Sequence, residues 1–251
     1  MALKAVFFDI GSTLWRSPAE DPGALAYCYG RGREYLVRHY GDAPSMEELI
    51  EAVEGYFAEW EDRWKADVTL VHQPPTTDFV RDALLKLGLD PPHDVLASFT
   101  DAVLETSVYT AKTLEPEPGM PEALEALRGL GLRLACVSNA FMGAGVLNRI
   151  LEERGLGAHC ELTLSSCELG VRKPHPRIYE EALEALGVAG AEAVFVGDRL
   201  DADVEGPARL GMRTVLTHQY RREDPGGARV APDAVIAHLS ELPGVLKRWL
   251  A

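Results

Sequence analysis

The sequence predicts an α/β protein: a doubly wound parallel sheet with an all-helical domain inserted after the first strand. Short apolar runs that end in polar residues alternate with helical stretches through most of the chain, as expected for strands that are buried on both faces. Between residues 18 and 113 this alternation stops and only helical periodicity remains. We therefore expect a core domain of residues 1–17 and 114–251 and a helical domain of residues 18–113.

The first strand is predicted at Ala5–Phe8. Its four apolar residues lead directly to Asp9, and the turn-forming residues Gly11 and Ser12 follow before Thr13. A short apolar run bounded in this way is typical of a strand in the middle of a parallel sheet. Asp9 is therefore expected at the carboxyl end of that strand.

Amphipathic periodicity predicts four helices in the inserted domain. Ser45 and Glu48 have the spacing of a capping box, which places the start of the second helix at Met46. Proline pairs interrupt the chain between the later helices. The four predicted helices are Ala24–His39, Met46–Lys65, Thr77–Leu87 and Asp94–Tyr109.

Alternation of strands and helices returns after residue 119 and continues to the end of the chain. The further predicted strands are Leu132–Val137, Leu162–Leu164, Ala193–Val196, Arg213–Leu216 and Ala234–Ile236. The predicted helices are Pro121–Gly129, Gly145–Arg154, Pro176–Leu186, Val204–Leu210 and Leu242–Trp249.

Composition excludes some partners and leaves others open. The formal net charge is −14 and the pI about 4.9, so nucleic acid and anionic membrane surfaces are not expected partners. A small phosphorylated substrate needs only a local positive group. The four cysteines form no zinc-binding pattern, and no apolar run reaches the roughly 18 residues of a membrane span. We expect a cytoplasmic protein with reduced thiols, either a monomer or a homodimer.

Polar residues follow several of the predicted strands, where ligands bind in open parallel sheets. Asp9 and Thr13 follow the first strand, and Ser138 and Asn139 follow the second. Further along the chain, Lys173 precedes a helix, and Asp198 and Asp203 follow the strand Ala193–Val196. This combination of carboxylate, hydroxyl, amide and ammonium groups predicts one active site at that edge of the sheet.

These residues lie in four segments: Asp-Ile-Gly-Ser-Thr-Leu at 9–14, Val-Ser-Asn at 137–139, Ser-Cys-Glu-Leu-Gly-Val-Arg-Lys-Pro-His-Pro at 166–176 and Val-Gly-Asp-Arg-Leu-Asp-Ala-Asp at 196–203. In sequence, order and spacing, the four segments resemble the motifs of the haloacid dehalogenase-like (HAD) superfamily. The resemblance implies a Rossmann-like core, a helical cap formed by residues 18–113, and hydrolysis of a small phosphorylated molecule.

The resemblance also implies a role for each residue. Asp9 would attack phosphorus and form an aspartyl-phosphate intermediate. Mg²⁺ would be held by Asp9, Asp198 and the main-chain carbonyl of Gly11, with Asp203 as a further ligand or a residue that orients the site. Lys173 would neutralise both Asp9 and the substrate.

Phosphate oxygens would be bound by hydroxyl, amide and ammonium groups and by nearby main-chain N–H groups. The side chains expected to contribute are Thr13, Ser138, Asn139 and Lys173.

The sequence departs from the family pattern at Gly11. Phosphatases of the family carry a second aspartate there, which protonates the leaving group and later activates water. Glycine can do neither, and general acid–base catalysis is typically worth ~10²–10⁴ in rate. Alkyl phosphates, whose leaving group is poor, are therefore expected to react slowly.

Three functions remain open on these grounds. The favoured one is a Mg²⁺-dependent phosphohydrolase for good leaving groups such as acyl or aryl phosphates, or one whose substrate or cap supplies the proton. The second is a 2-haloacid dehalogenase, against which Asp198 and Asp203 count, because those relatives usually lack the metal-binding aspartate. The third is a weak or inactive relative that binds a ligand or a protein, as in the Reg-2-like group, which also lacks the second aspartate.

Overall fold

The computed structural model describes residues 2–16, 19, 21–114, 118–227 and 229–251. The chain divides into two compact units. Unit 1 comprises Met1–Pro18 and Glu115–Ala251, and unit 2 comprises Ala19–Leu114. Within the described ranges, no helix is both long and apolar enough to cross a membrane.

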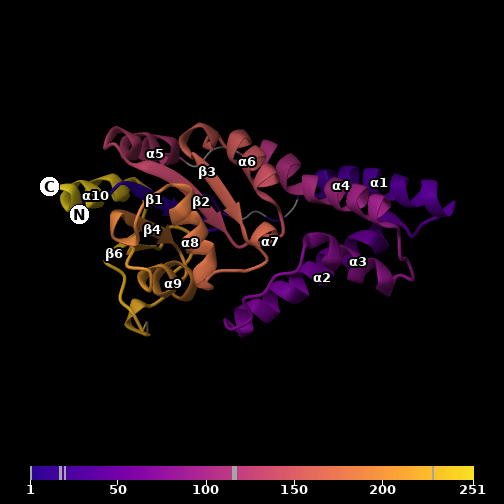
Figure 1. Ribbon diagram of the computed structural model, residues 1–251. Coiled ribbons are helices and arrows are strands. Elements are labelled where there is room, and N and C mark those ends of the chain that lie inside the picture. Colours follow the sequence, from indigo (N-terminus) through magenta and orange to yellow (C-terminus); the bar gives the residue numbers. More distant parts are fainter. Residues whose placement is uncertain (1, 17–18, 20, 115–117, 228) are drawn as a thin grey trace. The chain divides into compact units, whose positions relative to one another are not determined.

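The described part of unit 1 contains a six-stranded sheet in which all neighbouring strands are parallel (Figure 1). Its spatial order is β3-β2-β1-β4-β5-β6. The strands are β1 (Ala5–Phe8), β2 (Arg133–Ser138), β3 (Leu162–Ser165), β4 (Ala193–Gly197), β5 (Arg213–Thr217) and β6 (Ala234–Ile236). The predicted doubly wound α/β fold is confirmed.

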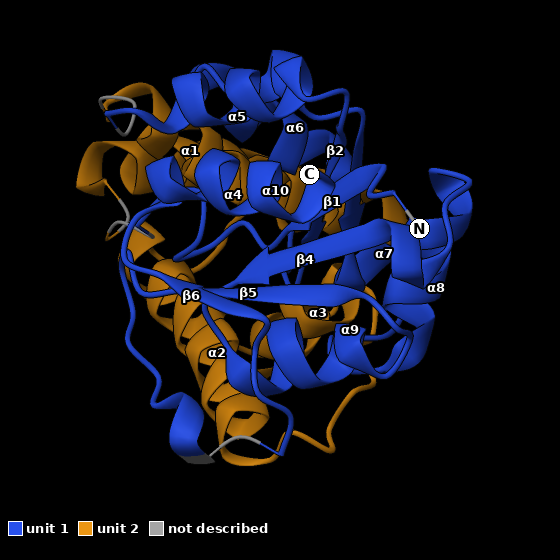
Figure 2. Cartoon of the chain, turned by 90° about the vertical axis from the view of Figure 1, so that its left-hand side faces the viewer, with its two compact units in different colours: residues 1–18, 115–251 blue, residues 19–114 orange. Residues whose placement is uncertain are grey.

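Helices cover both faces of this sheet, with α5, α6 and α10 on one side and α8 and α9 on the other (Figure 2). The helices of unit 1 are α5 (Met120–Gly129), α6 (Ala144–Glu153), α7 (Ser166–Leu169), α8 (Pro176–Ala185), α9 (Gly206–Ala208) and α10 (Leu242–Leu250). On the α8 face, Phe7, Val137 and Phe195 pack against Ile178 and Tyr179. The strands are thus buried on both faces, which explains their continuous apolar runs.

The strand order reverses direction at β1, and this reversal positions the site. After β1 the chain builds outward through β2 and β3, and then returns to the other side of β1 to form β4. Loops leaving β1 and β4 therefore diverge and leave room for a ligand at the carboxyl ends of these strands. Asp9 follows β1 and Asp198 follows β4.

Unit 2 is helical throughout its regular structure in the described residues. Its helices are α1 (Pro22–Tyr40), α2 (Met46–Ala66), α3 (Thr76–Lys86) and α4 (His93–Lys112). The predicted capping box is present: the Ser45 hydroxyl accepts from the Glu48 N–H, and the Glu48 carboxylate accepts from the Ser45 N–H at 2.8 Å. Apolar side chains of all four helices form one core, including Leu36, Val53, Val80 and Phe99.

One predicted helix differs from the structure. Instead of a helix over Val204–Leu210, a π-helical segment η3 (Leu200–Glu205) begins earlier and is followed by the single turn α9. Pro207 has no N–H to extend a helical ladder, and the space where a Cβ of Gly206 would lie is taken by the Tyr179 hydroxyl. The short helix α7, which lies inside the third motif, was not predicted.

Candidate active site

Asp9 lies where β1 ends, at the centre of the sheet. Its main-chain N–H donates to the carbonyl of Val196 in β4 at 2.9 Å, which continues the strand pairing up to this residue. The next turn brings Thr13 back, and its hydroxyl donates to Asp9 Oδ2 at 3.1 Å. Within that turn Ser12 adopts the left-handed backbone region, at φ 59°. The turn thus fixes one oxygen of the carboxylate.

Lys173 binds the other oxygen of Asp9. Its Nζ donates to Asp9 Oδ1 at 2.7 Å and to Asp203 Oδ1 at 2.8 Å, and its side chain is buried. The main chain of Lys173 is held by the Asn139 amide: the Lys173 N–H donates to Oδ1 at 2.8 Å, and Nδ2 donates to the Lys173 carbonyl at 3.0 Å. Asn139 follows β2, so the amide connects this strand end to the lysine loop.

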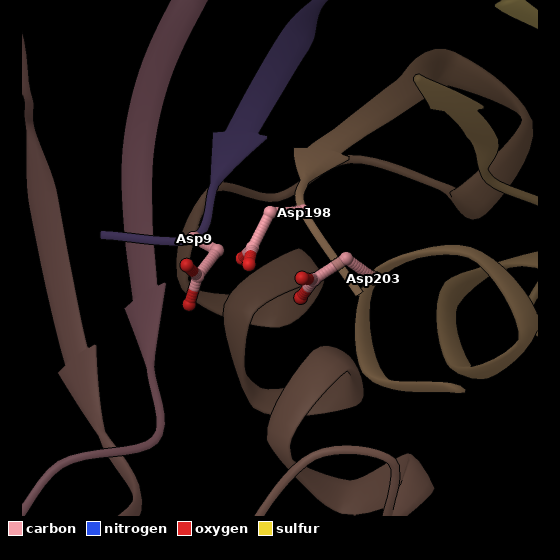
Figure 3. A group of neighbouring side chains, drawn as sticks. All are labelled: Asp9, Asp198 and Asp203. Atoms are coloured by element: carbon pink, nitrogen blue, oxygen red, sulfur yellow. The ribbon is translucent and has the colours of Figure 1, made fainter. Parts of the chain in front are cut away.

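The two further carboxyl groups come from the end of β4 and from η3. Figure 3 shows the side chains of Asp9, Asp198 and Asp203 converging at the strand ends. Asp203 also accepts from the Arg199 N–H at 3.0 Å. A Cβ at Gly197 would lie 2.3 Å from the Asp203 carboxyl carbon, so glycine is needed for this close approach.

Asp198 has longer contacts than its neighbours. The Thr13 hydroxyl lies 3.4 Å from its Oδ1, and Arg221 Nη1 lies 3.9 Å from its Oδ2. Arg221 also pairs with Glu223 at 3.2 Å. The carboxyl of Asp198 is therefore compensated less closely than those of Asp9 and Asp203.

The electrostatics follow from this arrangement. Burial, followed by repulsion from Asp9 and Asp203, raises the pKa of Asp198 to about 8. Burial also raises the pKa of Asp203 to about 6, although Lys173 opposes the shift. Burial lowers the pKa of Lys173, but the Asp203 and Asp9 carboxylates outweigh it, so that the net shift is upward and the ammonium stays charged.

The donor set fits a hard divalent cation. Ligand oxygens of Asp9, Asp198 and Asp203 all lie within 4.8 Å of one another. In the described part of this cluster, three buried carboxyl groups face a single buried ammonium, so negative charge is in excess. Carboxylate oxygens are the ligands that Mg²⁺ prefers, and a cation beside Asp198 would favour its ionised form.

The structure places the other predicted residues at the same edge of the sheet. Ser138 is the last residue of β2, one strand from Asp9, and is buried. Gly11 lies in the turn after β1 and forms an isolated bridge with Trp15. Arg221 is a charged neighbour of the site that the sequence did not single out, because it follows no predicted strand end directly and belongs to none of the four motifs.

The site has a central aspartate at a strand end, and a buried lysine and two further acids face it. This is the arrangement of a Rossmann-like protein whose functional carboxylates lie at the edge of the sheet. Comparison with known proteins gives the family. The model of the haloacid dehalogenase-like hydrolases matches residues 3–211, and the chain belongs to this family. The resemblance predicted from the four motifs is confirmed.

Two relatives with assigned names match over most of their length. A glyceraldehyde 3-phosphate phosphatase of Methanopyrus kandleri is 31% identical over 98% of this chain and 97% of its own. A protein of the same name from Pyrococcus abyssi is 37% identical over 85% of this chain and 80% of its own. Among solved structures, a 2-haloacid dehalogenase of Pseudomonas syringae superposes with a TM-score of 0.63 at 26% identity, covering 98% of this chain and 99% of that one.

Proposed function

We propose that the chain is a Mg²⁺-dependent phosphohydrolase that acts on a small phosphorylated metabolite through an aspartyl-phosphate intermediate on Asp9. The observation that carries this proposal is the bridge from Lys173 Nζ to Asp9 and Asp203, beside the third carboxyl of Asp198. A nucleophilic carboxylate can approach a phosphoryl group only where positive charge offsets the repulsion, and this arrangement supplies it.

The proposed reaction has two displacements at phosphorus. First, an Asp9 carboxylate oxygen bonds to phosphorus while the bond to the leaving oxygen breaks. This gives an acyl phosphate on Asp9 and an alkoxide or carboxylate leaving group, and the alkoxide takes its proton from solvent water. Water then attacks phosphorus, the bond to Asp9 breaks, and inorganic phosphate leaves. Throughout, Lys173 offsets the charge on Asp9 and on the phosphoryl oxygens, and Ser138 binds another of those oxygens.

Asp9, Asp198 and the Gly11 carbonyl are the proposed Mg²⁺ ligands. When bound, the ion would offset the charge that develops on the phosphoryl oxygens. Asp203 already accepts from Lys173 and from the Arg199 N–H. We therefore assign Asp203 mainly to orienting Lys173.

For Asn139 we propose a role other than the phosphate contact expected from the sequence. Both polar atoms of its amide bind the main chain of Lys173. We therefore assign Asn139 to positioning the lysine, with Thr13 holding Asp9 Oδ2 in the same way. The direct phosphate contacts are then left to Lys173, Ser138 and main-chain N–H groups.

The lack of a side chain at Gly11 affects the rates of both displacements in the proposed reaction. With no carboxyl at this position, neither the leaving group nor the attacking water receives help from residue 11. The second displacement is then slow, and the acyl phosphate on Asp9 should accumulate during turnover. Substrates whose leaving group needs no proton, such as acyl and aryl phosphates, should react faster than alkyl phosphates.

The relatives support a small phosphorylated metabolite as the substrate class. Two of them are named glyceraldehyde 3-phosphate phosphatases and match this chain over most of their length. A three-carbon phosphate of this kind is accordingly the first natural substrate to test. Acetyl phosphate and p-nitrophenyl phosphate represent good leaving groups.

Phosphate release from these three compounds, with Mg²⁺ and with EDTA, tests the proposal. We expect Mg²⁺-dependent release that falls at least about 10³-fold in Asp9→Asn. Release of halide from a 2-haloacid without metal would instead indicate a dehalogenase. Phosphate binding without any turnover, a result that Gly11 would favour, would indicate a ligand-binding protein.

A further inference from the structure

Two cysteines far apart in the sequence lie side by side in unit 1. Cys136 is in the middle of β2, and Cys160 follows the short 3₁₀ turn η1 (Gly157–His159) that precedes β3. Their sulfur atoms are 3.3 Å apart. All four cysteines of the chain lie in the described ranges, and none of them forms a disulfide. The pair was not evident from the sequence, because 24 residues separate its members.

The two thiols have different surroundings. Cys136 is fully buried, between Phe8 of β1 and Thr163 of β3 in the sheet register. Cys160 is partly exposed. Of the two cysteines, Cys160 is therefore the one that a small reagent reaches more readily, and the Cys136 sulfur lies 3.3 Å from its sulfur.

The contact between the two sulfur atoms affects the pKa of each thiol. The hydrogen bond with Cys136 lowers the pKa of Cys160; burial opposes this shift, and Arg128 adds a smaller lowering. The hydrogen bond to Cys160, together with burial, raises the pKa of Cys136 well above its usual value. Arg128 is held beside this segment, because its Nη1 donates to the Ala158 carbonyl at 3.2 Å.

We propose that Cys160 and Cys136 form a peroxide-reactive dithiol, a modification site in which Cys160 is the reacting cysteine and Cys136 resolves it. The Cys160 thiolate attacks one oxygen of a hydroperoxide; the O–O bond breaks, and the other oxygen leaves as an alcohol or water after taking a proton. Cys160 is now a sulfenic acid. The Cys136 sulfur then attacks the Cys160 sulfur, the S–OH bond breaks, and hydroxide leaves as water with the proton of Cys136.

The two sulfur atoms must come closer for a disulfide to form. A disulfide needs its sulfur atoms at about 2.05 Å, so the present 3.3 Å separation must shorten by about 1.2 Å. Cys136 is fixed by strands on both sides, so the segment that carries Cys160 is the part that moves. The disulfide would fasten this segment to β2, two residues before Ser138 at the active site.

Treatment of the reduced, full-length protein with hydrogen peroxide tests this inference. We expect the intact chain to lose the mass of two hydrogen atoms. A digest with trypsin and endoproteinase Glu-C without reductant, which separates Cys160 from Cys167 at Glu161, should contain a Cys136–Cys160 cross-linked peptide. Dithiothreitol should restore the original mass. Circular dichroism before and after treatment checks that the fold is retained.

Single variants separate the roles of the two cysteines. In Cys136→Ser, Cys160 should stop at the sulfenic acid and be labelled by dimedone. In Cys160→Ser, neither the cross-link nor the label should form. Cys167→Ser is the matched control, because Cys167 is also partly exposed but has the Ser165 hydroxyl, not a thiol, at 3.3 Å; it should behave like the wild type.

Two outcomes would overturn the inference. One is oxidation of the wild type that only adds oxygen, with no Cys136–Cys160 peptide in the digest. The other is unchanged cross-linking in Cys160→Ser, which would place the disulfide elsewhere. Because the wild-type digest alone decides the first outcome, the test stands even where a variant fails to fold.

Discussion

At the scale of single residues, Lys173 determines how three carboxyl groups coexist at one sheet edge. Its ammonium binds Asp9 and Asp203 within 2.8 Å of each, and its side chain is buried. An unpaired buried charge costs several kcal/mol, whereas a hydrogen-bonded pair offsets most of that cost. The same contact that permits the cluster to fold also prepares Asp9 for its proposed role.

Replacement of Lys173 by Met should therefore damage both stability and activity. Removing one partner from a buried ion pair typically costs about 3–5 kcal/mol, and here it also leaves carboxylates facing one another. Urea denaturation followed by circular dichroism measures the loss. In the double variant Lys173→Met with Asp203→Asn, part of the stability should return while activity stays absent. Equal stability of Lys173→Met and wild type would contradict this description of the site.

Gly11 is the residue that most limits the proposed catalysis. Gly11→Asp should raise the turnover of an alkyl phosphate by about 10²–10⁴, the usual contribution of general acid–base catalysis. With acetyl phosphate, the rate of the first displacement should change less than it does with an alkyl phosphate, because the acetate leaving group needs no proton. Steady-state phosphate release measures turnover of the alkyl phosphate, and rapid-quench measurement of the rate at which Asp9 is phosphorylated measures the first displacement with acetyl phosphate. A Gly11→Asp protein that binds Mg²⁺ but gains nothing with either substrate would argue against a working nucleophile.

At the scale of elements, the strand ends were predictable and the connections between them were only partly so. Strands buried on both faces leave continuous apolar runs, so Ala5–Phe8 and the residues after it were located by pattern alone. Asp9 and Asp198 could be assigned to one edge because parallel strands end together, whereas Lys173 was joined to them by its motif. The motifs then supplied the expected role of each.

Features that depend on tertiary approach were not predictable in this way. At the π-helical segment η3, Asp203 packs against Gly197, and the Tyr179 hydroxyl occupies the space where a Cβ of residue 206 would lie. The two-sided binding of Lys173 by Asn139 depends on loops from two distant segments. None of these contacts produces a periodicity or a residue spacing that can be recognised in the sequence.

In unit 2, Glu54 of α2 is expected to make the free energy of unfolding depend on pH. Burial raises the pKa of Glu54, and the hydrogen bond from the Tyr29 hydroxyl opposes the shift only partly. A carboxyl whose pKa is raised on folding binds its proton more tightly in the folded state. Its contribution to stability is therefore full below the unfolded pKa of 4.5 and falls as pH rises through the folded value.

Glu54→Gln should remove this part of the pH dependence. Urea midpoints measured between about pH 4 and pH 7 should fall less steeply in the variant than in the wild type. Glu51→Gln, at an exposed position of the same helix, is the control and should leave the slope unchanged. A wild-type slope retained in Glu54→Gln would exclude Glu54 as its source.

At the scale of the whole molecule, the chain carries a formal charge of −14 and concentrates buried acids at one edge of its sheet. Such a protein attracts cations, and a cation bound at Asp9 and Asp198 stabilises the folded state that forms the site. Anionic substrates, by contrast, are repelled by the net charge. In the proposed function, Lys173 and Mg²⁺ would supply the local positive charge that phosphate binding needs.

Mg²⁺ should accordingly raise the thermal midpoint of unfolding. At about 100 times the Kd, one bound ion adds about 2.7 kcal/mol to the free energy of unfolding. Differential scanning calorimetry with Mg²⁺ and with EDTA measures the shift. Asp198→Asn should abolish it, whereas Asp101→Asn, which removes the same charge at an exposed position of α4, should not. An equal shift in both variants would indicate non-specific binding.

The most direct measurement is a rapid acid quench of the enzyme during turnover of acetyl phosphate with Mg²⁺, followed by peptide mass spectrometry. With Gly11 in place, we expect a hydroxylamine-sensitive phosphoryl group on the peptide that contains Asp9, present in the wild type and absent in Asp9→Asn. Turnover that proceeds without any phosphorylated Asp9, or that continues in Asp9→Asn, would contradict the proposed mechanism.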